Sequence, residues 1–167
     1  MIQLSLEHLY SKSPYKIIPI NNNLDFFTDT NTHYRISFTQ EAAIGGCDTY
    51  QFIIRKVESI PTSHDPKVEA TILTIVDEFF RSNLNVLLYI CDTSDNREEA
   101  RNRLFLTWFE RNAEPERFTI RTANAEVEGE GFYAVIIVEN RNPKLKKIME
   151  EFEQAAQMLI EEKPENS

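Results

Sequence analysis

The first half of the chain carries apolar residues at the two-residue spacing that is typical of strands. Tyr34, Ile36 and Phe38 alternate with polar residues, which predicts a half-buried strand. Pro19 lies in the first apolar run and favours a sheet edge there, because proline has no backbone N–H to donate. Short connections join the runs, so we expect an antiparallel meander. Its four strands are predicted at residues 15–20, 24–27, 34–39 and 49–57.

The second half of the chain alternates helical spacing with continuous apolar runs. Asp65 and Pro66 form a typical helix start, an N-cap followed by a proline in the first turn. Continuous apolar runs at 86–90 and 132–139 predict strands that are buried on both faces. A further strand, bulged near Ala123, is expected before a hairpin turn. The helices are predicted at 66–81, at 96–112 and from 142 onward, the further strand at 118–127 and its turn at 128–131.

The order of these elements, β-β-β-β-α-β-α-β-β-α, predicts an α+β fold. We expect a single domain over residues 1–162, with one mixed, mostly antiparallel sheet of about seven strands and three main helices. Strands 49–57 and 86–90 are expected to be parallel, because the helix between them can form a right-handed crossover. Residues 163–167 are expected to fray. Residues 1–12 fit both a strand and a short helix.

Charge and composition lower the expectation of several function classes. The 167 residues carry 27 acidic and 18 basic side chains, a net charge of -9 that is spread over both halves. Nucleic-acid binders usually present a basic surface, so no nucleic-acid partner is predicted. The N-terminus does not resemble a signal peptide and no apolar run is long enough for a bilayer, so we expect a cytoplasmic protein without a membrane partner.

The cysteines and histidines do not form a recognisable metal or redox motif. Cys47 and Cys91 lack CxxC spacing and are expected to be reduced thiols. No two of the three histidines have metal-ligand spacing, so neither a metal nor another cofactor is predicted. His64 is disfavoured as a base for Cys91, because the crossover would put the two residues at opposite ends of the sheet. His33 opens an amphipathic strand and is expected to be solvated.

The candidate ligand site lies where the strand 86–90 ends and the next helix begins. Ligands favour the C-terminal ends of strands in α/β sheets. Arg97 and Arg101 fall on the same helical arc as apolar residues, where an unpaired charge is costly. They either pair with local carboxylates, such as Asp92 or Asp95, or extend past the helix end, or form an anion site near the start of their helix. The candidate residues are Cys91, Asp92, Ser94, Arg97 and Arg101.

The element order also resembles the acyl-CoA N-acyltransferase fold, in which a meander is followed by helix, strand, helix and a terminal hairpin. That family holds the pyrophosphate of the coenzyme with a glycine-rich turn at the start of the helix after the meander. Here the segment from Pro61 to Pro66 has no glycine, and Asp65 would repel an anion. An active acyltransferase is therefore less expected than a degenerate relative.

Two segments of the sequence resemble a Bacteroidetes family of short proteins of unknown function. They are DPKVEATILTIVDEFF and YICDTSDNREEARNRLFLTWF. The resemblance implies a bacterial cytosolic protein and carries no activity, cofactor or site residue. The leading expectation is a non-enzymatic binding or interaction module for an unknown protein or a small anionic ligand. Alternatives are a degenerate acyltransferase relative and a regulatory partner that acts through its acidic surface. A homodimer formed through an edge strand also stays open.

Overall fold

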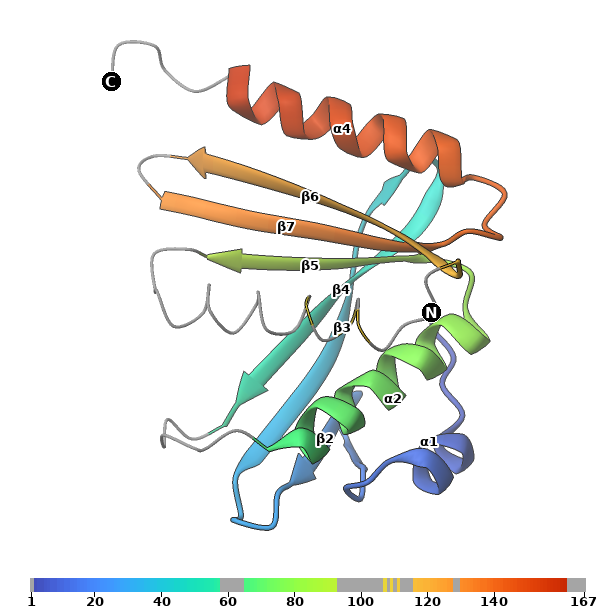
Figure 1. Ribbon diagram of the computed structural model, residues 1–167, viewed down its shortest axis with the longest axis vertical. Helices are drawn as coiled ribbons and strands as arrows, with labels where there is room; N and C mark the ends of the chain where they lie inside the picture. Colours follow the sequence, from blue (N-terminus) through green and yellow to red (C-terminus); the bar gives the residue numbers. More distant parts are fainter. Residues whose placement is uncertain are drawn as a thin grey trace. The chain divides into compact units, whose positions relative to one another are not determined.

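A computed structural model describes residues 2–57, 65–92, 107, 109, 111, 116–127 and 130–161. The fold is α+β, with one mixed seven-stranded sheet in the order β1-β2-β3-β4-β5-β7-β6 (Figure 1). The predicted fold class is therefore confirmed. The strands are β1 Ile18–Ile20, β2 Asn23–Phe27, β3 His33–Ile44, β4 Cys47–Lys56, β5 Val86–Asp92, β6 Phe118–Val127 and β7 Glu130–Glu139. The helices of the described ranges are α1 Leu6–Lys12, α2 Pro66–Ser82 and α4 Leu145–Glu161.

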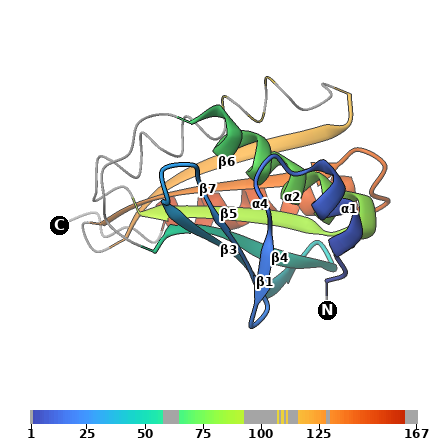
Figure 2. The same cartoon turned by 90° about the horizontal axis from the view of Figure 1, so that it is seen from below.

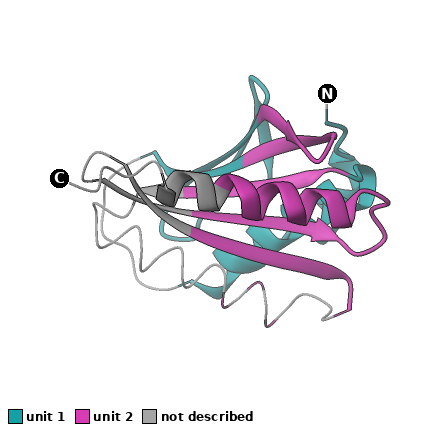
Figure 3. Ribbon diagram, turned by 90° about the horizontal axis from the view of Figure 1, so that it is seen from above, with its two compact units in different colours: residues 1–39, 52–84 teal, residues 40–51, 85–167 magenta. Residues whose placement is uncertain are grey.

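Two compact units divide the chain (Figure 3). The first comprises Met1–Thr39 and Phe52–Leu84, and the second comprises Gln40–Gln51 and Asn85–Ser167. A single domain over residues 1–162 stays a prediction. None of the helices in the described residues is long and apolar enough to cross a membrane.

The first unit contains the antiparallel meander and the helices α1 and α2. β1 pairs with β2 and β2 with β3, both antiparallel, as predicted. The helix α1 lies beside α2 (Figure 2). β1 lies at the sheet edge, as Pro19 predicts, but it is only three residues long. The backbone N–H of Tyr15 donates to Thr71 Oγ1 instead of to a neighbouring strand. The buried apolar core of this unit includes Leu9, Ile17, Phe26, Ile36, Phe52, Ile75, Phe79 and Phe80.

The structure resolves the ambiguous start of the chain in favour of a helix. Ser5 is the N-cap of α1, and its side chain accepts a hydrogen bond from the backbone N–H of His8. Leu9 faces inward and is fully buried. The N-cap and the burial of Leu9 favour a helix over the strand that the alternation of the first residues suggests.

The second unit contains the parallel strand pair and the terminal hairpin. Thr49–Gln51 of β4 lie opposite Val86–Leu88 of β5 in parallel, as the crossover predicts. β7 lies between β5 and β6 and is antiparallel to both. The β6–β7 register runs without interruption from Phe118 opposite Glu139, so the bulge expected near Ala123 is wrong.

Burial in the second unit follows the predicted pattern with one exception. β7 is buried from Val135 to Val138, on both faces. β5 is less enclosed, because Ile90 near its end is 40% exposed. α4 packs Ile148 and Phe152 into a cluster with Cys47, Val86, Ile136 and Val138.

The predicted helix at 96–112 lies mostly outside the described residues. Thr107, Phe109 and Arg111 have helical backbone, in agreement with the prediction. Phe109 is buried and its ring centroid lies 5.3 Å from that of Phe118.

Candidate functional site

The predicted anion site is described only at its strand end. Cys91 and Asp92 are the last residues of β5 and lie opposite Tyr133 and Phe132 of β7. Ser94, Arg97 and Arg101 lie outside the described residues, as does His64. The juxtaposition of these five candidate residues therefore stays a prediction.

Three buried carboxylates form the charged clusters that the described residues contain. Asp25 and Glu78 are fully buried, and Glu139 is 4% exposed. A buried carboxylate is costly unless charged donors satisfy it. Each of the three is paired with at least one arginine. If the partners of each carboxylate satisfy it fully, the charge is structural and is not available to a ligand.

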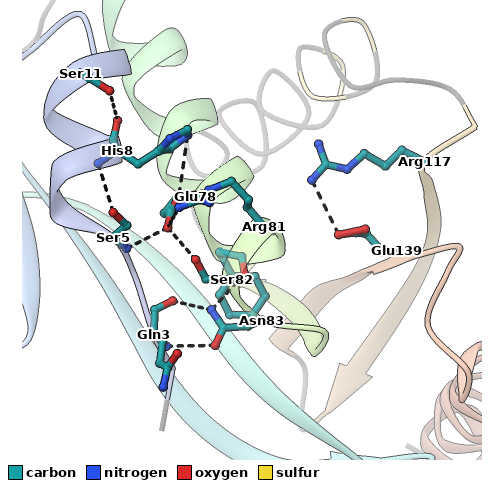
Figure 4. Close-up of polar contacts among 11 residues, drawn as sticks. Gln3, Ser5, His8, Ser11, Glu78, Arg81, Ser82, Asn83, Arg117 and Glu139 are labelled. Atoms are coloured by element: carbon teal, nitrogen blue, oxygen red, sulfur yellow. Dashed lines mark hydrogen bonds and ion pairs between the residues drawn. The ribbon is translucent and has the colours of Figure 1, made fainter.

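Glu78 lies on α2 and accepts hydrogen bonds at both of its carboxylate oxygens (Figure 4). Oε1 accepts from the backbone N–H of Ser5 at 2.8 Å and from Ser82 Oγ at 2.6 Å. Arg81 donates to Oε2 through Nε at 2.8 Å and to Oε1 through Nη2 at 3.0 Å. His8 Nε2 lies 3.7 Å from Oε2. Burial alone would raise the pKa of Glu78, but the hydrogen bonds from Arg81, Ser82 and Ser5 outweigh it and lower the pKa.

Asn83, at the end of α2, makes a second connection to the N-terminal segment. The backbone N–H of Gln3 donates to Asn83 Oδ1 at 3.0 Å, and Asn83 Nδ2 donates to the carbonyl of Gln3 at 2.7 Å. Asn83 Nδ2 also donates to the carbonyl of Phe79 at 3.0 Å, which caps the helix. Glu78 and Asn83 therefore tie the first residues of the chain to the C-terminal part of α2.

Asp25 on β2 is held by two neighbours on β3. Arg35 donates to it through Nε at 3.0 Å and Nη2 at 2.9 Å, and His33 Nε2 donates at 2.6 Å. Burial would raise the pKa of Asp25, but the hydrogen bonds from Arg35 and His33 lower it below its ordinary value. The expectation that His33 is solvated is wrong: its side chain is 16% exposed, because it covers Asp25.

Glu139, at the end of β7, is held by arginines on both sides of the hairpin. Arg141 Nε donates to Oε2 at 2.6 Å. Arg117 Nη2 lies 3.7 Å from Oε1 (Figure 4). The hydrogen bond to Glu139 raises the pKa of Arg141. This cluster fixes the base of the β6–β7 hairpin.

The start of α2 is closed by its own residues. Asp65 Oδ1 accepts from the backbone N–H of Lys67 at 2.9 Å, and the Asp65 carbonyl accepts from that of Val68 at 3.0 Å. Pro66 has no N–H to offer. Tyr15 Oη donates to Asp65 Oδ2 at 2.5 Å, and this hydrogen bond, together with burial, raises the pKa of Tyr15. The donors that a helix start presents to an anion are thus already occupied.

The buried polar side chains of the described residues therefore form satisfied structural clusters. Within the described residues, no group of three metal-ligating side chains occurs and no buried side-chain polar atom lacks a partner. Cys47 is buried, and its Sγ accepts from Asn142 Nδ2 at 3.6 Å. The sequence offered one overlooked signal for the Glu78 cluster: a glutamate beside Phe79 on the apolar face of the helix, with arginine three residues later.

Comparison with known proteins assigns a family. A model described as a family of unknown function, DUF6169, matches residues 64–154, which is more than half of the chain. The chain therefore belongs to the DUF6169 family, and the predicted membership of a family of unknown function is confirmed. No curated protein and no solved structure matches the chain. The Bacteroidetes source and the likeness to the acyltransferase fold stay predictions.

Proposed function

We propose that the chain is a cytoplasmic, bacterial, non-enzymatic module that binds a protein or a small anionic ligand and takes no nucleic-acid or membrane partner. The observation that carries the proposal is the closed start of α2. Asp65 caps it with a carboxylate, and Pro66 removes a further donor. A diphosphate group would meet negative charge where the acyltransferase fold offers free N–H groups.

The second candidate is a degenerate relative of the acyl-CoA N-acyltransferases. The parallel pairing of β4 with β5 directly after an antiparallel meander supports it, as does the terminal β6–β7 hairpin. These features concern the order of elements and carry no catalytic residue. A ligand pocket could survive in such a relative after the chemistry is lost.

The first test is coenzyme binding. We expect acetyl-CoA and CoA, each at about 1 mM, to leave the melting temperature unchanged, because, in the described residues, the start of α2 has no free donors for a diphosphate. Binding would be detectable, since a ligand at about 100 times its Kd would stabilise the fold by about 2.7 kcal/mol. Differential scanning calorimetry measures the shift. Asp65→Ser is the matched variant, because it keeps a helix cap without the charge. A saturable shift of the wild type, with release of the CoA thiol in the presence of an amine acceptor, would overturn the non-enzymatic assignment.

The anion site at the end of β5 is a further part of the proposal. Its support is the position of Cys91 and Asp92 at the C-terminal end of a strand that lies between a parallel and an antiparallel neighbour. We expect inorganic phosphate or a nucleotide to raise the melting temperature of the wild type by a few degrees and that of Arg101→Ala by less than half as much. If neither ligand shifts either protein, Arg97 and Arg101 are structural.

A further inference from the structure

One face of the meander carries exposed apolar and basic side chains together. Phe27 of β2 lies opposite His33 of β3 and stacks on it, with ring centroids 4.3 Å apart. The backbone N–H of Val57, just beyond β4, donates to the carbonyl of His33 at 2.9 Å. Phe27, His33 and Val57 thus form a row across three chain segments. Phe27 and Val57 are each 42% exposed.

A second row lies two residues further along the same strands. Asp25 pairs with Arg35 in the β2–β3 register. The Val57–His33 hydrogen bond sets β3 and β4 antiparallel, so Arg55 takes the position opposite Arg35. Residues two apart on a strand share a face. We name the surface formed by Phe27, His33, Arg35, Arg55 and Val57 the meander face.

The meander face is the side of the meander that points away from the core of the first unit. Residues of the opposite parity pack inward: Phe26 stacks with Tyr34, and Phe38 contacts Phe52 and Phe79 of α2. The meander face therefore contributes little to this core. Its exposed apolar side chains, Phe27 and Val57, are therefore available for contact with a partner.

The charges on the meander face are not balanced. The Arg35 guanidinium is neutralised by buried Asp25, but within the described residues the Arg55 side chain makes no hydrogen bond or ion pair and is exposed. Like charges at opposing positions of neighbouring strands destabilise a sheet. The face thus keeps a positive charge in a chain whose net charge is -9. A carboxylate from a partner would relieve the repulsion.

We propose that the meander face docks an acidic protein segment that carries an apolar or aromatic anchor. The inference rests on the proposed function and names the partner of that binding module. Exposed phenylalanine and arginine are the residue types enriched in protein interfaces, and arginine is frequent among their hot spots. Carboxylates of the segment pair with Arg55 and the exposed part of Arg35, while its anchor packs on Phe27 and Val57. A protein segment fits better than a nucleic acid, because the acidic chain would repel a polyanion.

The test selects ligands for the full chain from a library of random peptides displayed on phage. We expect enriched peptides to combine Asp or Glu with an aromatic or aliphatic residue. Fluorescence anisotropy then measures their affinity for the wild type and for variants. Arg55→Gln and Phe27→Ala should each weaken binding by at least about fivefold, the effect of losing a contributing interface residue. Arg111→Gln removes an exposed arginine elsewhere and should change affinity by less than about twofold.

Several results would overturn the proposal. The first is that no peptides are enriched, and the second is that the enriched peptides are basic or neutral. The third is binding that neither Arg55→Gln nor Phe27→Ala weakens. A single-stranded oligonucleotide that binds the same face more tightly than the peptides would assign it to nucleic acid. A dimer that Arg55→Gln dissociates, seen by analytical ultracentrifugation, would assign it to a second copy. Unchanged melting temperatures of the variants exclude unfolding as a cause. Acyl-CoA turnover would overturn the proposed function. The peptide experiment would still test the meander face, because it measures binding and not turnover.

Discussion

Replacing Gly45 by alanine is expected to lower the free energy of unfolding by about 2–5 kcal/mol. Gly45 has φ of +61°, a left-handed conformation that costs an alanine about 1–2 kcal/mol. A Cβ there would also lie 2.6 Å from the backbone nitrogen of Ile148 and 2.7 Å from its Cα. These are backbone atoms of α4, so the turn or the helix must move.

Gly46 is the matched control, because it is the neighbouring glycine of the same turn. It has φ of +74°, but a Cβ at this position would meet nothing within 4 Å. Gly46→Ala should therefore cost only the conformational part, about 1–2 kcal/mol. Urea unfolding followed by circular dichroism measures both variants. Equal losses would show that the contact with α4 does not matter.

The contacts of the turn explain why the difference should be large. The backbone N–H of Gly45 donates to Glu151 Oε2 at 2.6 Å, and Lys144 Nζ donates to the carbonyl of Gly46 at 2.6 Å. The β3–β4 turn is thereby bound to the first half of α4 and to the residue just before it. A shift that accommodates an alanine Cβ would weaken these hydrogen bonds as well.

Much of the fold could be predicted because it follows from local periodicity. The alternation through Tyr34, Ile36 and Phe38 identifies β3, and the helix start at Asp65 and Pro66 identifies α2. The parallel pairing of β4 with β5 follows from the helix between them. In each case the information lies within one element or its direct connection.

Apart from the spacing of Glu78 and Arg81, the charged clusters could not be predicted, because they depend on register and on long-range packing. His33 has the position of a solvated strand residue, and only its place opposite the end of β2 brings it to Asp25. Gly45 is readable as a turn residue, but its approach to Ile148 joins residues that lie about a hundred positions apart. Of the predicted anion site, the described residues include only Cys91 and Asp92.

Replacing Glu78 by glutamine is the second large effect we expect, a loss of about 2–4 kcal/mol at neutral pH. The amide has nearly the same shape, but its nitrogen cannot accept from Arg81 or Ser82. On one side of the fully buried group, the amide N–H of the glutamine would then face the donors of Arg81 or Ser82. Glu150→Gln is the control, since Glu150 is exposed on α4 and should change stability by less than about 0.5 kcal/mol.

The pH dependence of the loss separates the charge of Glu78 from its shape. Its pKa is lowered on folding from an ordinary 4.5, so the unfolded chain binds this proton more readily than the folded chain. The stabilisation is therefore complete above about pH 5 and disappears as the pH falls through 4.5 to the folded pKa. We expect the difference between wild type and Glu78→Gln, measured by urea unfolding, to shrink steadily over this range. Asp25 titrates in both proteins and cancels in the difference, because it is separate from the Glu78 cluster. A difference that stays constant from pH 7 to about pH 3 would mean that the loss comes from packing and not from the buried charge.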